Sequence, residues 1–189
     1  NFTDFYLPPS SRLQLYNNDH TTIAQTFNSS PNRESNRMGT WFVEGDIVWI
    51  EYFQPSNTSK TPRLQIGSVI HGYRMGDLDP SNPQGNRING SGPCNYDVNC
   101  PIGEDFDSQK DILKKSVAFV NLGNGYLCSA VLINNTKADK TPYILTANHC
   151  LVNSDPSLWS VRFNWVSPSP VCGTGEGSGD LQNNFTVSG

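Results

Sequence analysis

The residues best suited to chemistry lie in one short segment, 143–150, whose sequence is YILTANHC. An apolar, strand-like run there ends in His149, which is followed directly by Cys150. A second β-type segment, residues 127–133, carries Cys128, and a bond between the two cysteines would hold the histidine from behind. A general base needs such a setting, with a rigid platform and a ring open to a cleft. We therefore take His149 as the candidate catalytic base.

The other titratable residues are weaker candidates. His20 lies in a polar turn and His71 lies in the first half of the chain, so both are expected to be structural. Glu104, Asp105 and Asp107 form an acidic cluster that could bind calcium, but a solvated loop is the better interpretation. The three histidines are too scattered to form a zinc site with the cysteines. We expect no metal and no other cofactor.

All of the cysteines lie in the second half of the chain, and none forms a C-x-x-C pair. Disulfides in an exported protein are therefore a better interpretation than a metal site. The odd number indicates that one cysteine has its partner outside this sequence. The five residues are Cys94, Cys100, Cys128, Cys150 and Cys172.

The composition excludes several classes of protein. The formal net charge is −4 and the pI is about 5.2, with no basic run, which argues against a nucleic-acid partner. No apolar run approaches the ~20 residues that a membrane-spanning helix requires. Residue 1 is Asn and no charged-then-apolar leader is visible, so we expect a secreted or cell-surface protein whose signal peptide has been removed.

The pattern of apolar residues predicts a mainly β chain in two domains. Strand-like segments 13–16, 47–53 and 64–73 alternate with turn residues, which predicts a small β-sandwich over residues 1–76. Residues 77–92 are rich in Gly, Asn, Asp and Pro, a composition typical of a linker. The second domain, 93–189, is expected to have a helical turn at 107–115 and a loop-like tail after Cys172. Its expected strands are 116–121, 127–133, 143–146 and 159–165.

The T-A-x-H-C pattern at 146–150 resembles the histidine signature of trypsin-like serine proteases. Two larger blocks, 91–101 (SGPCNYDVNCP) and 132–136 (LINNT) followed by 142–150 (PYILTANHC), look like the mature start of bacterial lysyl endopeptidases. The resemblance covers roughly residues 91–172, and the preceding residues are similar to the pro-region of such enzymes. It implies that the second domain is the first half of a trypsin-like double β-barrel.

The resemblance assigns roles to single residues. His149 takes the position of the catalytic general base. The disulfides of the family fall on Cys128–Cys150 and Cys100–Cys172, and Cys94 would pair with a cysteine beyond this sequence. The catalytic aspartate and serine, and the residues that select lysine, would also lie downstream. The aspartates present in this region are therefore rejected as the third member of the triad: Asp111, Asp139, Asp155 and Asp180.

The resulting functional hypothesis is a secreted bacterial serine endopeptidase that cleaves protein or peptide substrates and is directed at lysine or arginine. This chain would carry only the histidine and would be inactive until the missing C-terminal part of the protease domain completes it. Arg87, the last basic residue before the mature-like start, is the candidate processing site. Two alternatives remain open, a pseudoprotease and a surface adhesin or carbohydrate-binding module. Sugars could stack on aromatic residues of the first domain, although packing in the core of a sandwich is the better interpretation for most of them: Trp41, Trp49, Tyr52 and Phe53.

Overall fold

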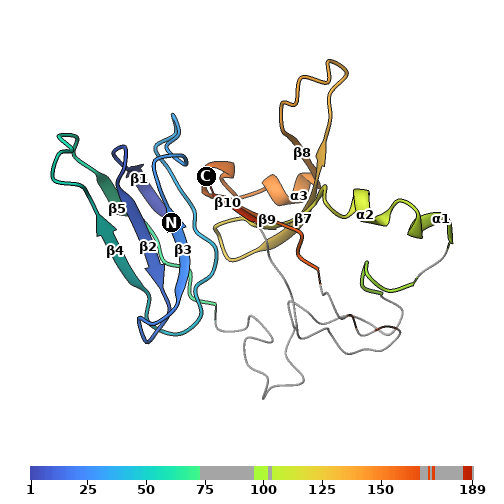
Figure 1. Cartoon of the computed structure of the whole chain (residues 1–189), viewed down its shortest axis with the longest axis horizontal. Coiled ribbons are helices and arrows are strands. Elements are labelled where there is room, and N and C mark those ends of the chain that lie inside the picture. Colours follow the sequence, from blue (N-terminus) through green and yellow to red (C-terminus); the bar gives the residue numbers. More distant parts are fainter. Residues whose placement is uncertain (73–95, 102–103, 167–169, 171, 173–184, 189) are drawn as a thin grey trace.

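The computed structural model describes residues 1–72, 96–101, 104–166, 170, 172 and 185–188 (Figure 1). The described chain is mainly β, as predicted, with short helices only. Two groups of strands lie side by side in Figure 1, and we call them the N-terminal part (residues 1–72) and the C-terminal part (residues 96–188). No helix among the described residues is long and apolar enough to cross a bilayer.

The N-terminal part contains two small antiparallel sheets. One pairs β1 (Phe2–Tyr6) with β5 (Arg63–Ile66). The other has the order β3-β2-β4, made of β3 (Ile23–Phe27), β2 (Arg12–Tyr16) and β4 (Trp49–Phe53). Because β2 pairs with both neighbours, it is the central strand of its sheet.

The two sheets of the N-terminal part share one hydrophobic core. Phe5 of β1 and Leu13 of β2 are almost fully buried, and Tyr52 of β4 and Leu64 of β5 pack against the same cluster. Burying a Phe or Leu side chain contributes about 1.5–3 kcal/mol. The core therefore joins the sheets into one unit, and its buried members are Phe2, Phe5, Leu7, Leu13 and Met38.

The C-terminal part is built on one five-stranded antiparallel sheet with the order β10-β9-β6-β7-β8. The central strand is β6 (Val117–Asn121), where Ala118 and Val120 are buried while Val117 is exposed, as the period-two rule requires. The sheet is open, and no closed barrel occurs among the described residues. The other strands are β10 (Phe185–Ser188), β9 (Ser160–Phe163), β7 (Leu127–Ile133) and β8 (Tyr143–Thr146).

Four short helical segments accompany this sheet. The helical turn expected at 107–115 is divided between α1 (Glu104–Asp107) and α2 (Lys110–Leu113). A single turn, α3 (Asn148–Leu151), follows β8 directly, and the 3-10 segment η1 (Pro156–Leu158) precedes β9. Asp155 caps η1 by accepting a hydrogen bond from the Ser157 backbone N–H at 2.9 Å.

Several predicted boundaries need correction. Strands β7 and β8 have the predicted bounds. The strand predicted at 64–73 is shorter: β5 ends at Ile66, and residues 67–72 do not pair with another strand. The tail expected to be a loop carries β10, whose backbone pairs with β9. Strands β1 and β3 were not predicted at all. Their sequences, FTDFY and IAQTF, are short and place polar residues between the apolar ones.

Candidate functional site

His149 lies at the point where the chain leaves β8 and turns into α3. Ala147 is still extended, with φ −72° and ψ 145°, and the helical turn begins at the next residue. The Thr146 hydroxyl donates a hydrogen bond of 2.8 Å to the Ser129 carbonyl on β7, which fixes the end of β8 to its neighbour. His149 is therefore not at the end of a strand, as expected, but in the helical turn that follows β8. Its side chain is exposed.

A disulfide between Cys128 and Cys150 holds this turn against the sheet. Cys128 lies on β7, and Cys150, which is 2% exposed, belongs to the core of the C-terminal part. A ring nitrogen of His149 and both sulfur atoms lie within 4.8 Å of one another. The buried sulfur of the next residue therefore restrains the backbone of His149, while the imidazole itself remains open to solvent.

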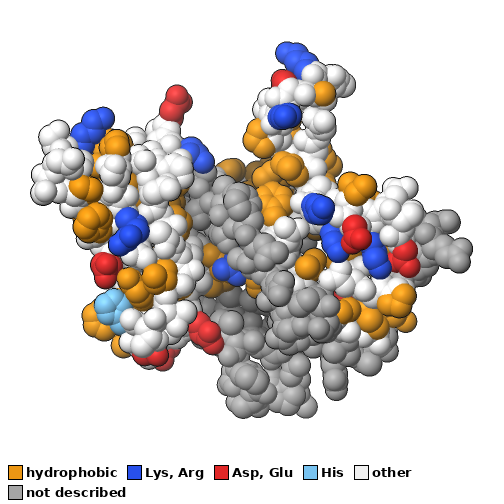
Figure 2. Space-filling model, in the orientation of Figure 1, with side chains coloured by type: hydrophobic (Ala, Val, Ile, Leu, Met, Phe, Trp, Pro, Cys, Tyr) orange, Lys and Arg blue, Asp and Glu red, His pale blue; other side chains and the backbone are white. Residues whose placement is uncertain are grey.

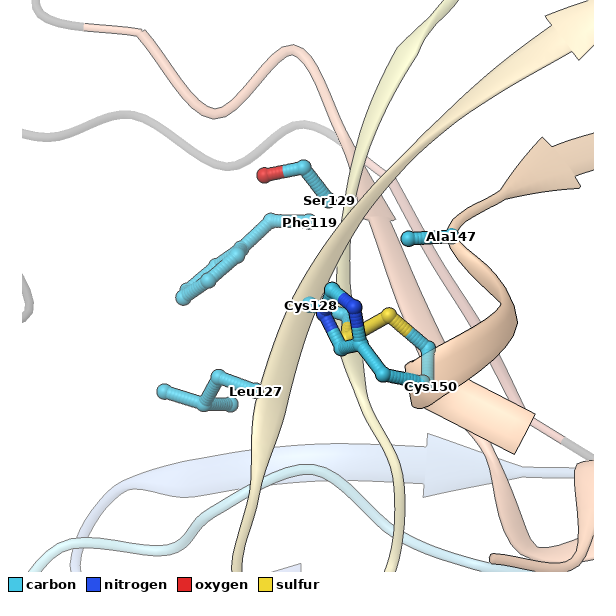
Figure 3. Close-up of a pocket in the computed structure, with 7 residues that line it drawn as sticks. Phe119, Leu127, Cys128, Ser129, Ala147 and Cys150 are labelled. Carbon is cyan, nitrogen blue, oxygen red and sulfur yellow. A yellow bond between two sulfur atoms is a disulfide. The ribbon is translucent and has the colours of Figure 1, made fainter. Parts of the chain in front are cut away.

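A hollow of about 380 Å³ lies beside the imidazole. In Figure 3 the side chains of Phe119 and Leu127 project to the same side, away from the Cys128–Cys150 disulfide. The lining side chains other than Ser129 and His149 are apolar or belong to the disulfide. A substrate group in this hollow would meet the imidazole as a proton-accepting side chain. The lining residues are Phe119, Leu127, Cys128, Ser129, Ala147, His149 and Cys150.

No described residue forms a hydrogen bond or an ion pair with the His149 imidazole. The described aspartates have other partners: Asp111 pairs with Lys114 at 2.6 Å, and Asp155 pairs with Arg37. Hydrogen bonds from Thr141 and Asn135 lower the pKa of Asp139, whose carboxylate stabilises the hairpin between β7 and β8. Asp180 lies outside the described residues.

A metal ion is a poor fit to this site. Cys128, His149 and Cys150 are the one group of potential ligands close enough together among the described residues. Both sulfur atoms are bonded to each other, however, and a metal needs thiolates. In the acidic segment, Asp107 pairs with Lys110 at 2.9 Å instead of facing an open site.

The other predicted residues fall in several places. Cys100 forms a disulfide with Cys172, across 72 positions of sequence. Cys94 and Arg87 lie outside the described residues. His20 lies 3.9 Å from a Glu51 carboxylate oxygen, and His71 lies 3.8 Å from an Asp46 oxygen, both within the N-terminal part.

The aromatic residues proposed for sugar binding do not share one exposed face. Trp41 is 4% exposed and Tyr52 packs against the core. Trp49 and Phe53 are about half exposed, and the His20 ring stacks on Trp49 with the ring centroids 5.1 Å apart. A binding surface made of all four residues is therefore not present.

Sequence reasoning missed the walls of the hollow. Phe119 and Leu127 were expected only as strand residues, and Ser129 was not considered. The signal was available in part, because Leu127 and Ser129 are two residues apart on β7 and must share a face of the strand. The contribution of Phe119 depends on the pairing of β6 with β7, where it lies opposite Ser129.

The sequence model of the lysyl endopeptidase C-terminal domain matches residues 88–189, which is more than half of the chain. The chain belongs to the lysyl endopeptidase C-terminal domain family. His149, the hollow and both disulfides lie within the matched residues. No solved structure matches the chain significantly.

Proposed function

We propose that this chain is part of a secreted serine endopeptidase of the lysyl type and that His149 is its general base. The observation that carries the proposal is the position of His149 within the family match. The imidazole is exposed at the rim of a hollow, while the neighbouring Cys150 is buried and bonded to Cys128. A base held in this way can exchange protons with a bound substrate and still keep its position.

The reaction would be hydrolysis of a peptide bond in two steps. His149 accepts the proton of a serine hydroxyl while the serine oxygen attacks the substrate carbonyl carbon. It then donates that proton to the leaving amine, and an acyl-enzyme remains. Water hydrolyses the acyl-enzyme by the same route in reverse order. The imidazolium formed at each step needs a carboxylate partner.

The nucleophile, the orienting aspartate and the donors of the oxyanion hole would come from the parent protein outside this sequence. Among the described residues, His149 bonds to no serine and no aspartate. Because these groups act as a unit, we expect this chain alone to be inactive. The residues before the family match would be a pro-region. The match begins at residue 88, directly after Arg87, which supports Arg87 as a processing site.

Activity of the full-length parent protein on a lysine peptide ester tests the proposal. We expect His149→Ala to reduce kcat/KM by at least about 10³-fold, since loss of one member of such a triad removes most of the catalysis. His71→Ala is the matched control and should leave kcat/KM unchanged. A lysyl chloromethyl ketone should alkylate His149, which peptide mass spectrometry would locate. A His149→Ala protein with wild-type activity would refute the assignment.

A further inference from the structure

The two parts of the chain meet at residues 37–41, which we call the strap, and at Asn1, whose side-chain amide donates a hydrogen bond to the Gly123 carbonyl. The strap belongs to the N-terminal part. The Met38 backbone exchanges two hydrogen bonds with the Phe2 backbone, at 2.8 and 3.1 Å. The Trp41 backbone is bound on both sides by the Gln25 side chain, which donates to its carbonyl at 2.9 Å and accepts from its N–H at 3.0 Å. These bonds fix the strap to the strands of its own part.

Polar contacts attach the other side of the strap to the C-terminal part. The Asn121 side-chain amide donates to the Thr40 carbonyl at 3.3 Å. The Arg37 guanidinium pairs with the Asp155 carboxylate, which also caps η1. These contacts join positions 118 and 81 residues apart, so the chain folds back on itself here.

The backbones approach so closely that Gly39 is required. A Cβ atom at Gly39 would lie 1.7 Å from the Leu158 carbonyl oxygen, and the three atoms nearest to it all belong to Leu158. Real Cβ contacts never reach that distance, so any other residue would force the two parts apart. Gly39 is buried, as an interface residue must be.

Trp41 is the largest side chain of the contact. Its ring packs on Phe119 and Trp165, with centroid distances of 5.5 and 6.2 Å. The Arg162 guanidinium lies over the Trp41 ring at 4.3 Å and over the Trp165 ring at 5.3 Å. Burial lowers the pKa of Arg162 to about 10, which still leaves it charged at neutral pH. A desolvated cation between two indoles is among the stronger contacts of its type.

We propose that the strap holds the N-terminal part on the C-terminal part without help from the connecting segment, so that the N-terminal part, once cut free, stays bound as a separate chain. The N-terminal part contains no cysteine, so no disulfide can supply this attachment. The interface is specific because it combines three features: the buried indole of Trp41, the close backbone contact at Gly39 and the ion pair of Arg37.

The interface also reaches the candidate site. Phe119 packs on Trp41 and forms a wall of the hollow beside His149. The docked N-terminal part therefore supports that wall. Its departure removes the Trp41 indole from Phe119, while the contact of Phe119 with Trp165, at a centroid distance of 5.6 Å, remains. This second step rests on the proposed role of His149, whereas the docking itself does not.

The test uses the full chain with a site-specific protease sequence inserted between residues 77 and 92. After cleavage, the two pieces should elute together in size-exclusion chromatography. Gly39→Ala should weaken their association at least about tenfold, measured by sedimentation across a dilution series, because a single clash at a packed interface costs that much or more. Arg162→Ala, on the opposite surface, should weaken it by a similar factor. Separation of the wild-type pieces at micromolar concentration would overturn the proposal.

Gly45→Ala is the matched control. Its added Cβ would lie 2.7 Å from the Asn18 Cβ, and its φ of +100° disfavours a side chain, so it strains the N-terminal part away from its contacts with the C-terminal part. Association of its pieces should equal that of the wild type. Equal weakening by Gly39→Ala and Gly45→Ala would mean that general strain, not the strap, is responsible, and would refute the role of the strap.

The effect of docking on the candidate site can be measured separately. Adding the N-terminal piece back to the separated C-terminal piece should shift the NMR signal of the His149 ring, through Phe119, whether or not the parent protein has activity. A His149 signal that does not respond while the pieces bind would refute the coupling and leave the docking intact. Loss of activity in His149→Ala bears only on the proposed function.

Discussion

The N-terminal part closes a core between two sheets and contains no cysteine, whereas the C-terminal part rests on one open sheet and two disulfides. In the first, Phe5, Leu7 and Leu13 are 0–1% exposed. In the second, the largest fully buried aliphatic side chain is Val120, and Cys150 belongs to the core itself. Covalent bonds are a usual means of stabilising a unit with a small core.

The C-terminal part also leaves more apolar surface uncovered. On the hairpin of β7 and β8, the exposed fractions of Tyr143, Ile144 and Leu145 are 49, 41 and 57%. Figure 2 shows hydrophobic side chains along this hairpin, with Lys side chains at its tip. Exposed apolar patches mark places where other protein packs. One part is thus closed by packing between two sheets, while the other combines a small core with two crosslinks and leaves an apolar hairpin exposed.

The largest effect should come from the core of the N-terminal part. Phe5→Ala removes a ring that is 1% exposed, and we expect it to lower the free energy of unfolding by about 3–5 kcal/mol. Hydrogen exchange, resolved by peptide, should show lost protection in residues 1–72 first. Phe53→Ala is the matched control, because that ring is 50% exposed and costs less to remove. Equal losses for the two variants would contradict the idea of a closed core.

The disulfide beside His149 should have the next largest effect. Its cysteines are 22 residues apart, and the loop-entropy model assigns about 3 kcal/mol to such a crosslink. The Cys128→Ser, Cys150→Ser variant should therefore lose protection in 117–163 while residues 1–72 keep theirs. If both parts lost protection equally, the N-terminal part would depend on this crosslink as well, and the contrast between a packed part and a crosslinked part would be wrong.

The prediction of the fold succeeded where a strand was apolar and long enough to show its period. Residues 127–133 and 143–146 became β7 and β8 with the predicted bounds. β3 was missed because its buried residue is Gln25, whose side chain bonds the Trp41 backbone. A polar residue facing inward hides the alternation on which strand prediction depends.

The candidate site was predictable in its centre but not in its surroundings. His149 and Cys150 are adjacent in the sequence, so their chemistry could be anticipated from one short motif. The single turn α3 could not, because four residues are too few to show a helical period. The strap was equally hidden. Gly39 looks like an ordinary loop glycine until Leu158, 119 residues later, is placed against it.

A smaller effect should follow from the hydrogen bond that ends β8. Thr146→Val keeps the side-chain shape but removes the hydroxyl that donates to the Ser129 carbonyl. We expect a loss of about 0.5–1.5 kcal/mol, the usual net contribution of one hydrogen bond. Thr146→Ser retains the hydroxyl and is the control. Urea unfolding would distinguish them, and a Val variant as stable as the Ser variant would show that the bond does not help to hold the turn that carries His149.

The smallest effect concerns Asp155, where the two parts are joined by charge. Hydrogen bonds from Ser157 and the nearby Arg37 guanidinium lower the pKa of its carboxyl. A lowered pKa means that this carboxylate stabilises the folded chain at pH values above its unfolded pKa, which is about 4. That contribution is lost as the pH falls through the lower folded pKa.

The difference in unfolding midpoint between the wild type and Asp155→Asn should therefore be present at pH 7 and shrink as the pH falls below about 4, through the lowered pKa of the folded state. It should be small throughout, because the side chain is 38% exposed and water screens the pair. Comparing the two proteins cancels the titration of every other carboxylate. A difference that grew on acidification would mean that the folded chain does not stabilise Asp155 as an anion. The ion pair between Arg37 and Asp155 would then not contribute to the strap contact.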